Sequence, residues 1–346
     1  MIIGADNITI DGDGYVLDGV APGICTWGDR SGIYNKGHDD AVIKNLEIKG
    51  FCNGIYFDYS CRNTVENCDI HHNGNVTSPS ATHGIKMQYI SNSTIRNNSI
   101  HDQIAYMDPN PGCEDGGNGL FLYQGWHNNI IENKFYNNTK AGMLIKMMPK
   151  YWNISHNHLW GNGQGGVILR CCSCNFNLIE YNNASDNYGS GIFIGGNDNT
   201  IRYNTVRNNR DGGPYYEDPL GSHGYGIHIG RSDGSLNNTL ISNTVCENDY
   251  LDILVVAGVT GNTGYENTCS TTCNYNDDGA TNCTYSCSTP QLLGDLNCDG
   301  IVTPADAVIA LQMAARGEYL PDADANCDDK VTSLDALLIL QTAARM

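Results

Sequence analysis

Apolar and polar residues alternate in short stretches through the first 257 residues of this chain. Eight of the stretches begin with a glycine followed by an apolar residue, and successive glycines lie 22 to 35 residues apart. The intervals of 22 to 25 residues define a basic unit, and the longer intervals correspond to this unit plus an insertion. The glycines are Gly32, Gly54, Gly84, Gly119, Gly142, Gly166, Gly191 and Gly226. Alternation with a period of two predicts strands, and a repeat of this length predicts a solenoid.

A second phrase follows these strands: an apolar residue, two variable residues, Asn, one variable residue and another apolar residue. It occurs as IRNNSI (95–100), IIENKF (130–135), ISHNHL (154–159), IEYNNA (179–184), IRYNTV (201–206) and LISNTV (240–245). Its asparagines are Asn98, Asn133, Asn157, Asn182, Asn204 and Asn243. They should stack at one corner, where each amide can hydrogen-bond the next and satisfy buried polar groups. Leu46 and Cys68 take this place earlier in the chain, so we expect the ladder to start late.

Three short strands per repeat of about 23 residues specify a right-handed parallel β-helix, because stacked coils bury a continuous column of apolar residues. Residues 1–257, with the opening NITIDGDGYVLDG, resemble the right-handed β-helix repeat proteins of microbial surfaces, of the carbohydrate-binding and sugar-hydrolase type. The resemblance implies an all-β solenoid of about nine coils. It leaves the function open, since this fold carries lyases, hydrolases, esterases, adhesins and scaffolds.

The long intervals carry their insertions immediately before a Gly-apolar strand, at residues 73–82, 102–117 and 209–223. Equivalent corners stack, so these loops should line one edge of the outer face formed by the Gly-apolar strands. Alternation predicts two outward columns of side chains on that face. The first is Tyr56, Lys86, Phe121, Leu144, Ile168, Phe193 and His228, and the second is Asp58, Gln88, Tyr123, Lys146, Arg170 and Gly195.

Cations, aromatic rings and a carboxylate on one face suit a polysaccharide, especially an acidic one. The predicted binding residues are Tyr56, Asp58, Lys86, Phe121, Tyr123, Leu144, Ile168, Phe193 and His228. Lys146 and Arg170 are the candidate catalytic residues, because β-helix polysaccharide lyases use a Lys or Arg to remove the proton alpha to a uronate carboxyl. Hydrolysis would need two carboxylates facing the glycosidic bond, and the acidic insertions offer no distinguishable pair.

A competing interpretation is that this face is covered. Leu144, Ile168 and Phe193 form an outward apolar stripe that should not face water, so the insertions or another subunit should lie on it. We favour covering or assembly over catalysis. The histidines join no cysteine or carboxylate at a recognised metal spacing, and we expect most of them to be solvated.

Charge and cysteine content limit the setting in which the protein works. Its 38 carboxylates against 19 Lys and Arg give a net charge of −19, which repels nucleic acid and anionic membranes. No apolar run is long enough to span a bilayer, and the first residues predict a strand rather than a signal peptide. Fifteen cysteines indicate an oxidising, extracellular or cell-surface location. Nine Asn-x-Ser/Thr sequons agree, although the repeat itself also requires Asn before β-branched residues.

Residues 258–293 are a Cys-rich cap or linker in which apolar periodicity fades. Cys269, Cys273, Cys283 and Cys287 form two C-x3-C pairs. A four-thiolate zinc site is conceivable, but two disulfides that staple a cap over the last coil fit the predicted location better. A β-helix needs such a cap because its end strands expose unpaired edges.

Residues 294–346 contain two loops, GDLNCDGIVTPAD and DADANCDDKVTSLD, each followed by a near-copy of one helix, DAVIALQMAARG or DALLILQTAARM. Oxygen ligands at the spacing of these loops suit Ca²⁺, so we predict two ions. The predicted ligands are Asp295, Asn297, Asp299, Ile301 (carbonyl) and Asp306, then Asp324, Asn326, Asp328, Lys330 (carbonyl) and Asp335.

This duplicated pattern resembles dockerin, a small α-helical calcium-binding domain that binds cohesin domains. The resemblance implies a cohesin-like partner. Positions that commonly face cohesin differ between the halves, as Pro304 and Ala305 against Ser333 and Leu334, which argues against two equivalent binding modes. Cys298 and Cys327 occupy the same loop position, and we predict a disulfide between them.

The sequence thus predicts an extracellular assembly protein. Its dockerin-like module would dock in a calcium-dependent way to a cohesin-like partner or to another copy, in which case filaments could form. The β-helix would be the scaffold and carry a glycan-binding face. The alternative is a polysaccharide lyase or glycoside hydrolase recruited through its dockerin.

Overall fold

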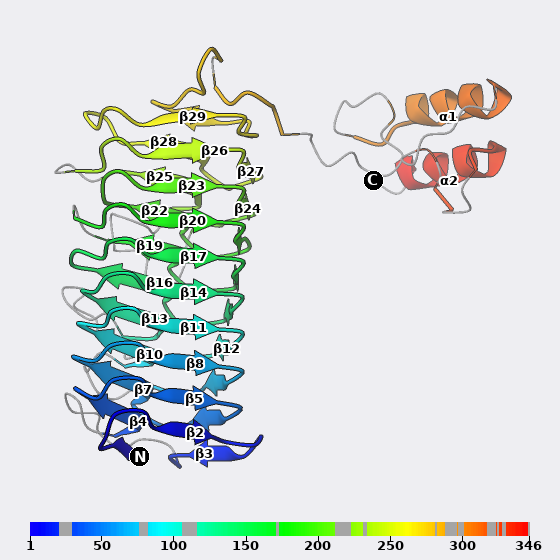
Figure 1. Cartoon of the computed structure of the whole chain (residues 1–346). Helices are drawn as coiled ribbons and strands as arrows, with labels where there is room; N and C mark the ends of the chain where they lie inside the picture. Colours follow the sequence, from blue (N-terminus) through cyan, green and yellow to red (C-terminus); the bar gives the residue numbers. More distant parts are fainter. Residues whose placement is uncertain are drawn as a thin grey trace. The chain divides into compact units, whose positions relative to one another are not determined.

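The computed structural model describes residues 1–20, 30–75, 82–105, 116–170, 173–211, 223–230, 234–280, 282–287, 296, 301–316, 323, 325–326 and 330–344. The chain divides into two compact units, Met1–Ser286 and Cys287–Met346. The first is an all-β solenoid in which three parallel sheets, A, B and C, run along the stack of coils (Figure 1). The β-helix prediction is confirmed.

Each sheet pairs strands from successive coils in parallel. Sheet A contains β1 (Ile2–Ile3), β4 (Ser31–Lys36), β7 (Asn53–Asp58), β10 (His83–Gln88), β13 (Asn118–Tyr123), β16 (Ala141–Lys146), β19 (Gly165–Leu169), β22 (Ser190–Ile194), β25 (Tyr225–Ile229), β28 (Leu251–Val255) and β30 (Thr272–Cys273). Sheet B contains β2 (Thr9–Asp11), β5 (Val42–Lys44), β8 (Thr64–Glu66), β11 (Thr94–Arg96), β14 (Asn129–Ile131), β17 (Asn153–Ser155), β20 (Leu178–Glu180), β23 (Thr200–Arg202), β26 (Thr239–Ile241) and β29 (Thr263–Tyr265). Sheet C contains β3 (Val16–Asp18), β6 (Glu47–Lys49), β9 (Asp69–His71), β12 (Ser99–His101), β15 (Lys134–Tyr136), β18 (His158–Trp160), β21 (Asn183–Ala184), β24 (Thr205–Arg207) and β27 (Thr244–Cys246).

The repeated glycine is required where sheet A passes close to sheet C. A Cβ atom on Gly54 would lie 2.7 Å from the carbonyl oxygen of Gly84 and 2.7 Å from Cγ2 of Ile70. Gly84 faces the same crowding from Gly119 and Ile100, at 2.6 and 2.9 Å. The glycine that marks each repeat therefore permits a close approach of backbone to core side chains.

The predicted asparagine ladder is confirmed. Each Nδ2 donates to Oδ1 of the asparagine one coil further on, at 2.9–3.0 Å, from Asn98 to Asn243. Two further ladders were not predicted. One is Asn138, Asn162, Asn187, Asn209 and Asn248, and the other is Asn177, Asn199, Asn238 and Asn262. In all three ladders, the donors point toward the C-terminal coils.

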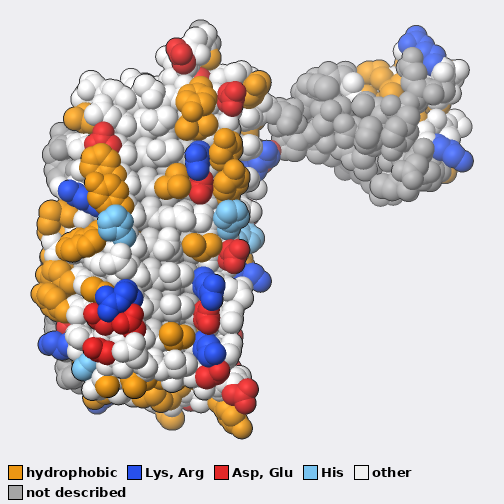
Figure 2. Space-filling view, in the orientation of Figure 1, with side chains coloured by type: hydrophobic (Ala, Val, Ile, Leu, Met, Phe, Trp, Pro, Cys, Tyr) orange, Lys and Arg blue, Asp and Glu red, His pale blue; other side chains and the backbone are white. Residues whose placement is uncertain are grey.

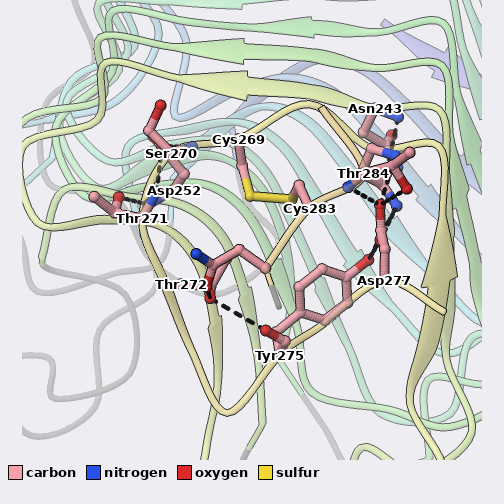
Figure 3. Close-up of a disulfide and its surroundings, with 12 residues drawn as sticks. Asn243, Asp252, Cys269, Ser270, Thr271, Thr272, Tyr275, Asp277, Cys283 and Thr284 are labelled. Carbon is pink, nitrogen blue, oxygen red and sulfur yellow. Dashed lines mark hydrogen bonds between the residues drawn. A yellow bond between two sulfur atoms is a disulfide. The ribbon is translucent and has the colours of Figure 1, made fainter. Parts of the chain in front are cut away.

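Carboxylates end two of these ladders inside the cap. Asn243 donates to Asn267, whose own Nδ2 donates to Oδ1 of Asp277 at 2.9 Å (Figure 3). Asn248 similarly donates to Oδ1 of Asp252 at 3.0 Å. A carboxylate only accepts hydrogen bonds, so it closes a row of donors without requiring a further coil. The solenoid continues through β29 and β30, beyond its predicted end at residue 257.

The cap disulfide joins Cys269 to Cys283, with their Cα atoms 5.5 Å apart (Figure 3). Cys287 is also disulfide-bonded, as are Cys52, Cys174 and Cys246. The prediction that Cys273 is bridged is wrong. Cys273 is a free, exposed thiol because it lies on β30, at the outer edge of sheet A, where it pairs with Leu254. Cys298 and Cys327 lie outside the described residues, so their disulfide stays a prediction.

In its described residues the second unit has two helices, α1 (Pro304–Arg316) and α2 (Ser333–Ala343), which pack around a small core. This core is Val302, Ala307, Ala310, Ala336 and Ile339. Thr332 caps α2, with its side chain accepting from the Leu334 N–H. Two packed helices alone do not identify a dockerin, so the dockerin-like fold stays a prediction.

Candidate binding site on the outer face of sheet A

The first predicted outward column is in register over seven strands of sheet A. Its members, from Tyr56 on β7 to His228 on β25, pair directly with their neighbours. All seven are at most 7 % exposed. The second column pairs Asp58 with Gln88, Gln88 with Tyr123 and Tyr123 with Lys146. The β-helix therefore brings the predicted binding residues onto one face, which is divided into a polar and an apolar part.

The polar part lies on β4, β7 and β10. The Lys86 ammonium lies 4.8 Å from the centre of the Tyr56 ring, a cation–π contact. The Tyr56 hydroxyl donates to Oε1 of Gln88. Asp58 lies beside Tyr56 in the second column and pairs with Lys36 at 3.8 Å. Asp58 and Lys86 are 8 % and 3 % exposed, so a carboxylate and an ammonium are both largely removed from water here.

Burial shifts the pKa of Asp58 and the pKa of Lys86 in the directions that favour their uncharged forms. It raises the pKa of Asp58, although the charges of Lys36 and Lys86 act in the opposite direction. It lowers the pKa of Lys86, partly offset by the charge of Asp58. Burial and the nearby Asp58 raise the pKa of Tyr56, so its hydroxyl keeps its proton. A buried acid and a buried base with opposite shifts are typical of sites where protons are transferred.

His83 completes this cluster and was missed in the sequence. It is fully buried at the start of β10, with its ring stacked on Phe121 at 4.5 Å. Its Nδ1 lies 3.4 Å from Nδ2 of Asn118, and its Nε2 has no hydrogen-bond partner among the residues described. Burial, reinforced by the charges of Lys86 and two further lysines, holds the pKa of His83 well below its usual value. Of the ten histidines only His83 and His228 are buried, so the expectation that most histidines are solvated fails for these two alone.

The apolar part forms a small second core on sheet A. It consists of Phe121, Ala141, Leu144, Ile168 and Phe193, with Tyr123 packed against it. The stripe is at most 6 % exposed, so the prediction that it is shielded from water is confirmed. Most of the three insertions lies outside the described residues, including 76–81, 106–115 and 212–222.

The candidate catalytic pair lies at the C-terminal ends of neighbouring strands. Lys146 is the last residue of β16, and Arg170 follows β19 directly. Both side chains are half-buried. Their catalytic role stays a prediction. At the far end of the apolar stripe, His228 contacts Phe193 edge-on, and neither of its ring nitrogens has a hydrogen-bond partner in the described part of the chain. Burial lowers the pKa of His228 to about 4.

Sheet B presents a different outer face, which Figure 2 shows from the front. Its middle is polar and nearly uncharged, and charged and hydrophobic side chains gather along both edges. The charges there form exposed or half-exposed pairs, such as Lys44 with Asp11 at 3.1 Å and Arg202 with Glu180 at 2.6 Å. Such pairs contribute little to stability and are typical of a solvated surface.

Five of the ten predicted calcium ligands are described: Ile301, Asp306, Asn326, Lys330 and Asp335. Asp306 and Asp335 are fully buried and make matching contacts. Oδ2 of Asp306 accepts from N–H and O–H of Thr303, at 2.8 and 2.9 Å, and Oδ2 of Asp335 accepts from the same groups of Thr332 at 2.8 Å. Burial raises the pKa of Asp335, but the hydrogen bonds from Thr332 outweigh it and lower the pKa overall. The calcium sites stay a prediction.

Comparison with known proteins identifies the class as a right-handed β-helix. A sequence model of the family "Right handed beta helix region" matches residues 31–220, more than half of the chain, and the chain belongs to this family. The fold is similar to the Dettilon tailspike protein gp208 (TM-score 0.55, 15 % identity, 85 % of this chain and 62 % of that one). It is also similar to the A-module of Azotobacter vinelandii mannuronan C-5 epimerase AlgE4 (TM-score 0.52, 15 % identity, 74 % of this chain and 71 % of that one). A third similar structure is pectate lyase Pel9A (TM-score 0.52, 17 % identity, 82 % of this chain and 65 % of that one).

At these identities the similarity establishes the fold alone. The chain spans less than two thirds of the tailspike protein and of the pectate lyase. No curated protein matches the chain significantly. Within the described ranges, no helix is long and apolar enough to cross a membrane.

Proposed function

We propose that this protein is an extracellular β-helix that binds a uronate-containing polysaccharide on the outer face of sheet A and cleaves it by β-elimination. The observation that carries the proposal is the buried cluster of Asp58, Lys86, Tyr56 and His83. It places an acid, a base and an aromatic ring on two adjacent strands, β7 and β10. The disulfides support an extracellular location.

The charge of the sheet A strands supports an anionic ligand. Lys36, Lys86 and Lys146 lie on β4, β10 and β16, Arg170 follows β19, and Asp58 is the one carboxylate on the outer face of the described strands β4 to β19. This excess of cations occurs in a protein whose net charge is −19. A cationic patch on an acidic protein attracts a sugar carboxylate locally.

In the proposed reaction, Lys86 in its neutral form takes the proton alpha to the uronate carboxyl. Its lowered pKa makes this form accessible. A carbon–carbon double bond forms as the glycosidic carbon–oxygen bond breaks, and the leaving oxygen takes a proton from the Tyr56 hydroxyl. Lys146 and Arg170 lie two and three strands further along sheet A, where they would neutralise carboxylates of other sugar units of the same chain. In this proposal they position the substrate rather than act as the base.

The test is an assay for unsaturated product, by absorbance, on a panel of uronate polysaccharides. Lys86→Met should lower the rate about 100-fold or more, the range expected for loss of a general base. Lys134→Met, on the exposed outer face of sheet C, is the matched control and should be unaffected. If the wild type binds a polysaccharide but forms no unsaturated product, the proposed cleavage is refuted and the proposed binding on sheet A stands. Absence of both would refute the proposal.

A second function, calcium-dependent docking, is proposed for residues 294–346. It is supported by the duplicated loop-helix sequence and by the matching contacts of Asp306 and Asp335. The ten predicted ligands are all oxygen donors, which fit Ca²⁺, and the ion would fix the loops that lead into α1 and α2. The partner would be a cohesin-like domain or a second copy of this chain.

Docking is tested by light scattering with and without a calcium chelator, alone and mixed with a cohesin. We expect a calcium-dependent increase in size that is lost when Asp306 and Asp335 are both changed to Ala. No change in size under any of these conditions would refute docking, whatever the outcome for the polysaccharide.

A further inference from the structure

Two exposed tyrosines lie where the coils turn from sheet A to sheet B, directly beside the polar part of sheet A. Tyr59 follows Asp58, the last residue of β7, and Tyr89 follows Gln88, the last residue of β10. Their rings stack, with centres 4.2 Å apart and planes 16° from parallel. The register of the sheet continues through this corner, because the Tyr59 N–H donates to the Gln88 carbonyl at 3.0 Å. The two rings therefore extend the polar part to the edge of the sheet.

The outer ring of this pair has one open face. Tyr59 is 59 % exposed although Tyr89 covers one side of its ring, so the other side faces solvent. That side is turned toward the preceding coil, where Gly37 stands at the matching position and donates its N–H to the Asp58 carbonyl at 2.9 Å. A Cβ atom on Gly37 would meet none of the described residues closer than 3.9 Å. The glycine thus leaves room for a flat group against the Tyr59 ring.

The polar groups beside this ring indicate which ligand it can stack. A sugar ring has C–H groups on its face, which the electron-rich face of an aromatic ring attracts, and hydroxyls at its rim, which need polar partners alongside. Asp58 and Gln88 supply such partners next to the two tyrosines. Lys36 pairs with Asp58 at 3.8 Å, and its side chain is 66 % exposed, which suits a ligand that carries a carboxylate. The combination fits an acidic sugar better than an apolar peptide segment.

We propose that the open face of Tyr59 is a sugar-stacking subsite, in which one unit of an acidic polysaccharide lies against the ring beside Gly37. The inference rests on the polysaccharide binding proposed above, and it adds the residue that holds the chain at the edge of sheet A. Tyr89 supports the ring from behind. Stacking is the same before and during cleavage, so Tyr59 should contribute to binding and not to the chemical step.

The first test measures binding of polygalacturonate and of alginate, two uronate polysaccharides, by affinity electrophoresis of the full chain. Tyr59→Ala should bind about tenfold more weakly, as expected when an anchoring aromatic contact is removed. Tyr59→Phe keeps the ring and should bind as the wild type does. Tyr203→Ala is the matched control, because Tyr203 is 41 % exposed, stacks on Tyr181 at 4.9 Å and lies at the corner between sheets B and C. The weakening by Tyr59→Ala should be equal at low and high salt, since salt does not screen stacking.

A second variant blocks the subsite without removing any of its groups. Gly37→Met places a side chain against the Tyr59 ring but offers no ring face of its own. The corner accepts this residue, because Met147 occupies the equivalent position after β16 with a φ of 59°, against 76° for Gly37. Gly37→Met should therefore weaken binding as much as Tyr59→Ala does. In the absorbance assay, both variants should raise KM and leave kcat unchanged.

The outcomes separate this subsite from the function on which it rests. If the wild type binds a polysaccharide and both Tyr59→Ala and Gly37→Met bind it equally well, the subsite is refuted and the proposed binding on sheet A stands. An equal loss in Tyr203→Ala would also refute the subsite. If the wild type binds neither polysaccharide, the subsite and the proposed function fail together.

Discussion

The polar and apolar parts of the outer face of sheet A share one backbone and one register but differ in chemistry. Tyr56 and Lys86 occupy the same column as Leu144 and Phe193, and all four are nearly buried. Strand pairing and burial therefore do not distinguish a binding site from a packing surface in this fold. The distinction lies in which side chain each repeat presents outward. Mutations in the apolar part should act on stability and those in the polar part on function.

The largest effect on stability is expected for Phe193→Ala in the apolar part. Removing a fully buried aromatic ring leaves a cavity, which costs about 3–5 kcal/mol of unfolding free energy. Urea unfolding followed by fluorescence measures the loss. Tyr181→Ala is the matched control, because Tyr181 is 48 % exposed and should cost much less. Equal losses would mean that the apolar part is not a core.

An intermediate loss of unfolding free energy is expected at low pH, through protonation of His228 at the end of the apolar stripe. Its pKa of about 4 in the folded state lies below the usual value of 6.5. The unfolded chain therefore binds more protons, and stability is lost as pH falls from 6.5 toward 4. By pH 4.5 the loss should be about 2–3 kcal/mol.

His228→Leu should remove this part of the pH dependence, whereas His127→Leu, at an exposed corner, should retain it. Urea unfolding at pH 7 and pH 4.5 makes the comparison. If all three proteins lose the same stability between these pH values, His228 is not the group that titrates.

The smallest effect on stability is expected for Lys86→Met in the polar part. The substitution removes a buried ammonium but leaves Asp58 paired with Lys36 at 3.8 Å, so the unfolding free energy should change by about 1 kcal/mol or less, in either direction. The same substitution should lower the rate of the proposed cleavage about 100-fold or more. If the Lys86→Met variant unfolds readily, Lys86 contributes to stability. The polar part would then not differ from the apolar part in its effect on stability.

The solenoid could be predicted because its causes are local. The glycine of each repeat and the asparagine of the first ladder lie at fixed positions in the unit, so periodicity alone identified them. The asparagines of the second and third ladders, such as Asn162 and Asn199, also recur once per coil. They were missed because they lie outside the apolar phrase that marks the first ladder.

The sites were harder to predict because they depend on which coils are neighbours. Gly37, Tyr59 and Tyr89 come from three successive coils, so no short motif contains them. His83 stands immediately before a repeat glycine, a position that the alternation did not assign to the outer face. The pairing of Cys269 with Cys283 likewise follows from how the last coil closes rather than from the C-x3-C spacing.

The direction of the asparagine ladders has a consequence for how such a protein can change in size. Each coil that carries the ladder asparagines offers the same acceptor to the coil before it and the same donor to the coil after it, so these coils make interchangeable junctions. Only Asp252 and Asp277 are specific to the end, because they accept without donating. Duplicating or deleting one coil of the ladders would therefore leave no further group unmatched, provided that this terminus is kept. Length is a variable that gene duplication can adjust one coil at a time, independently of the surfaces that the coils carry.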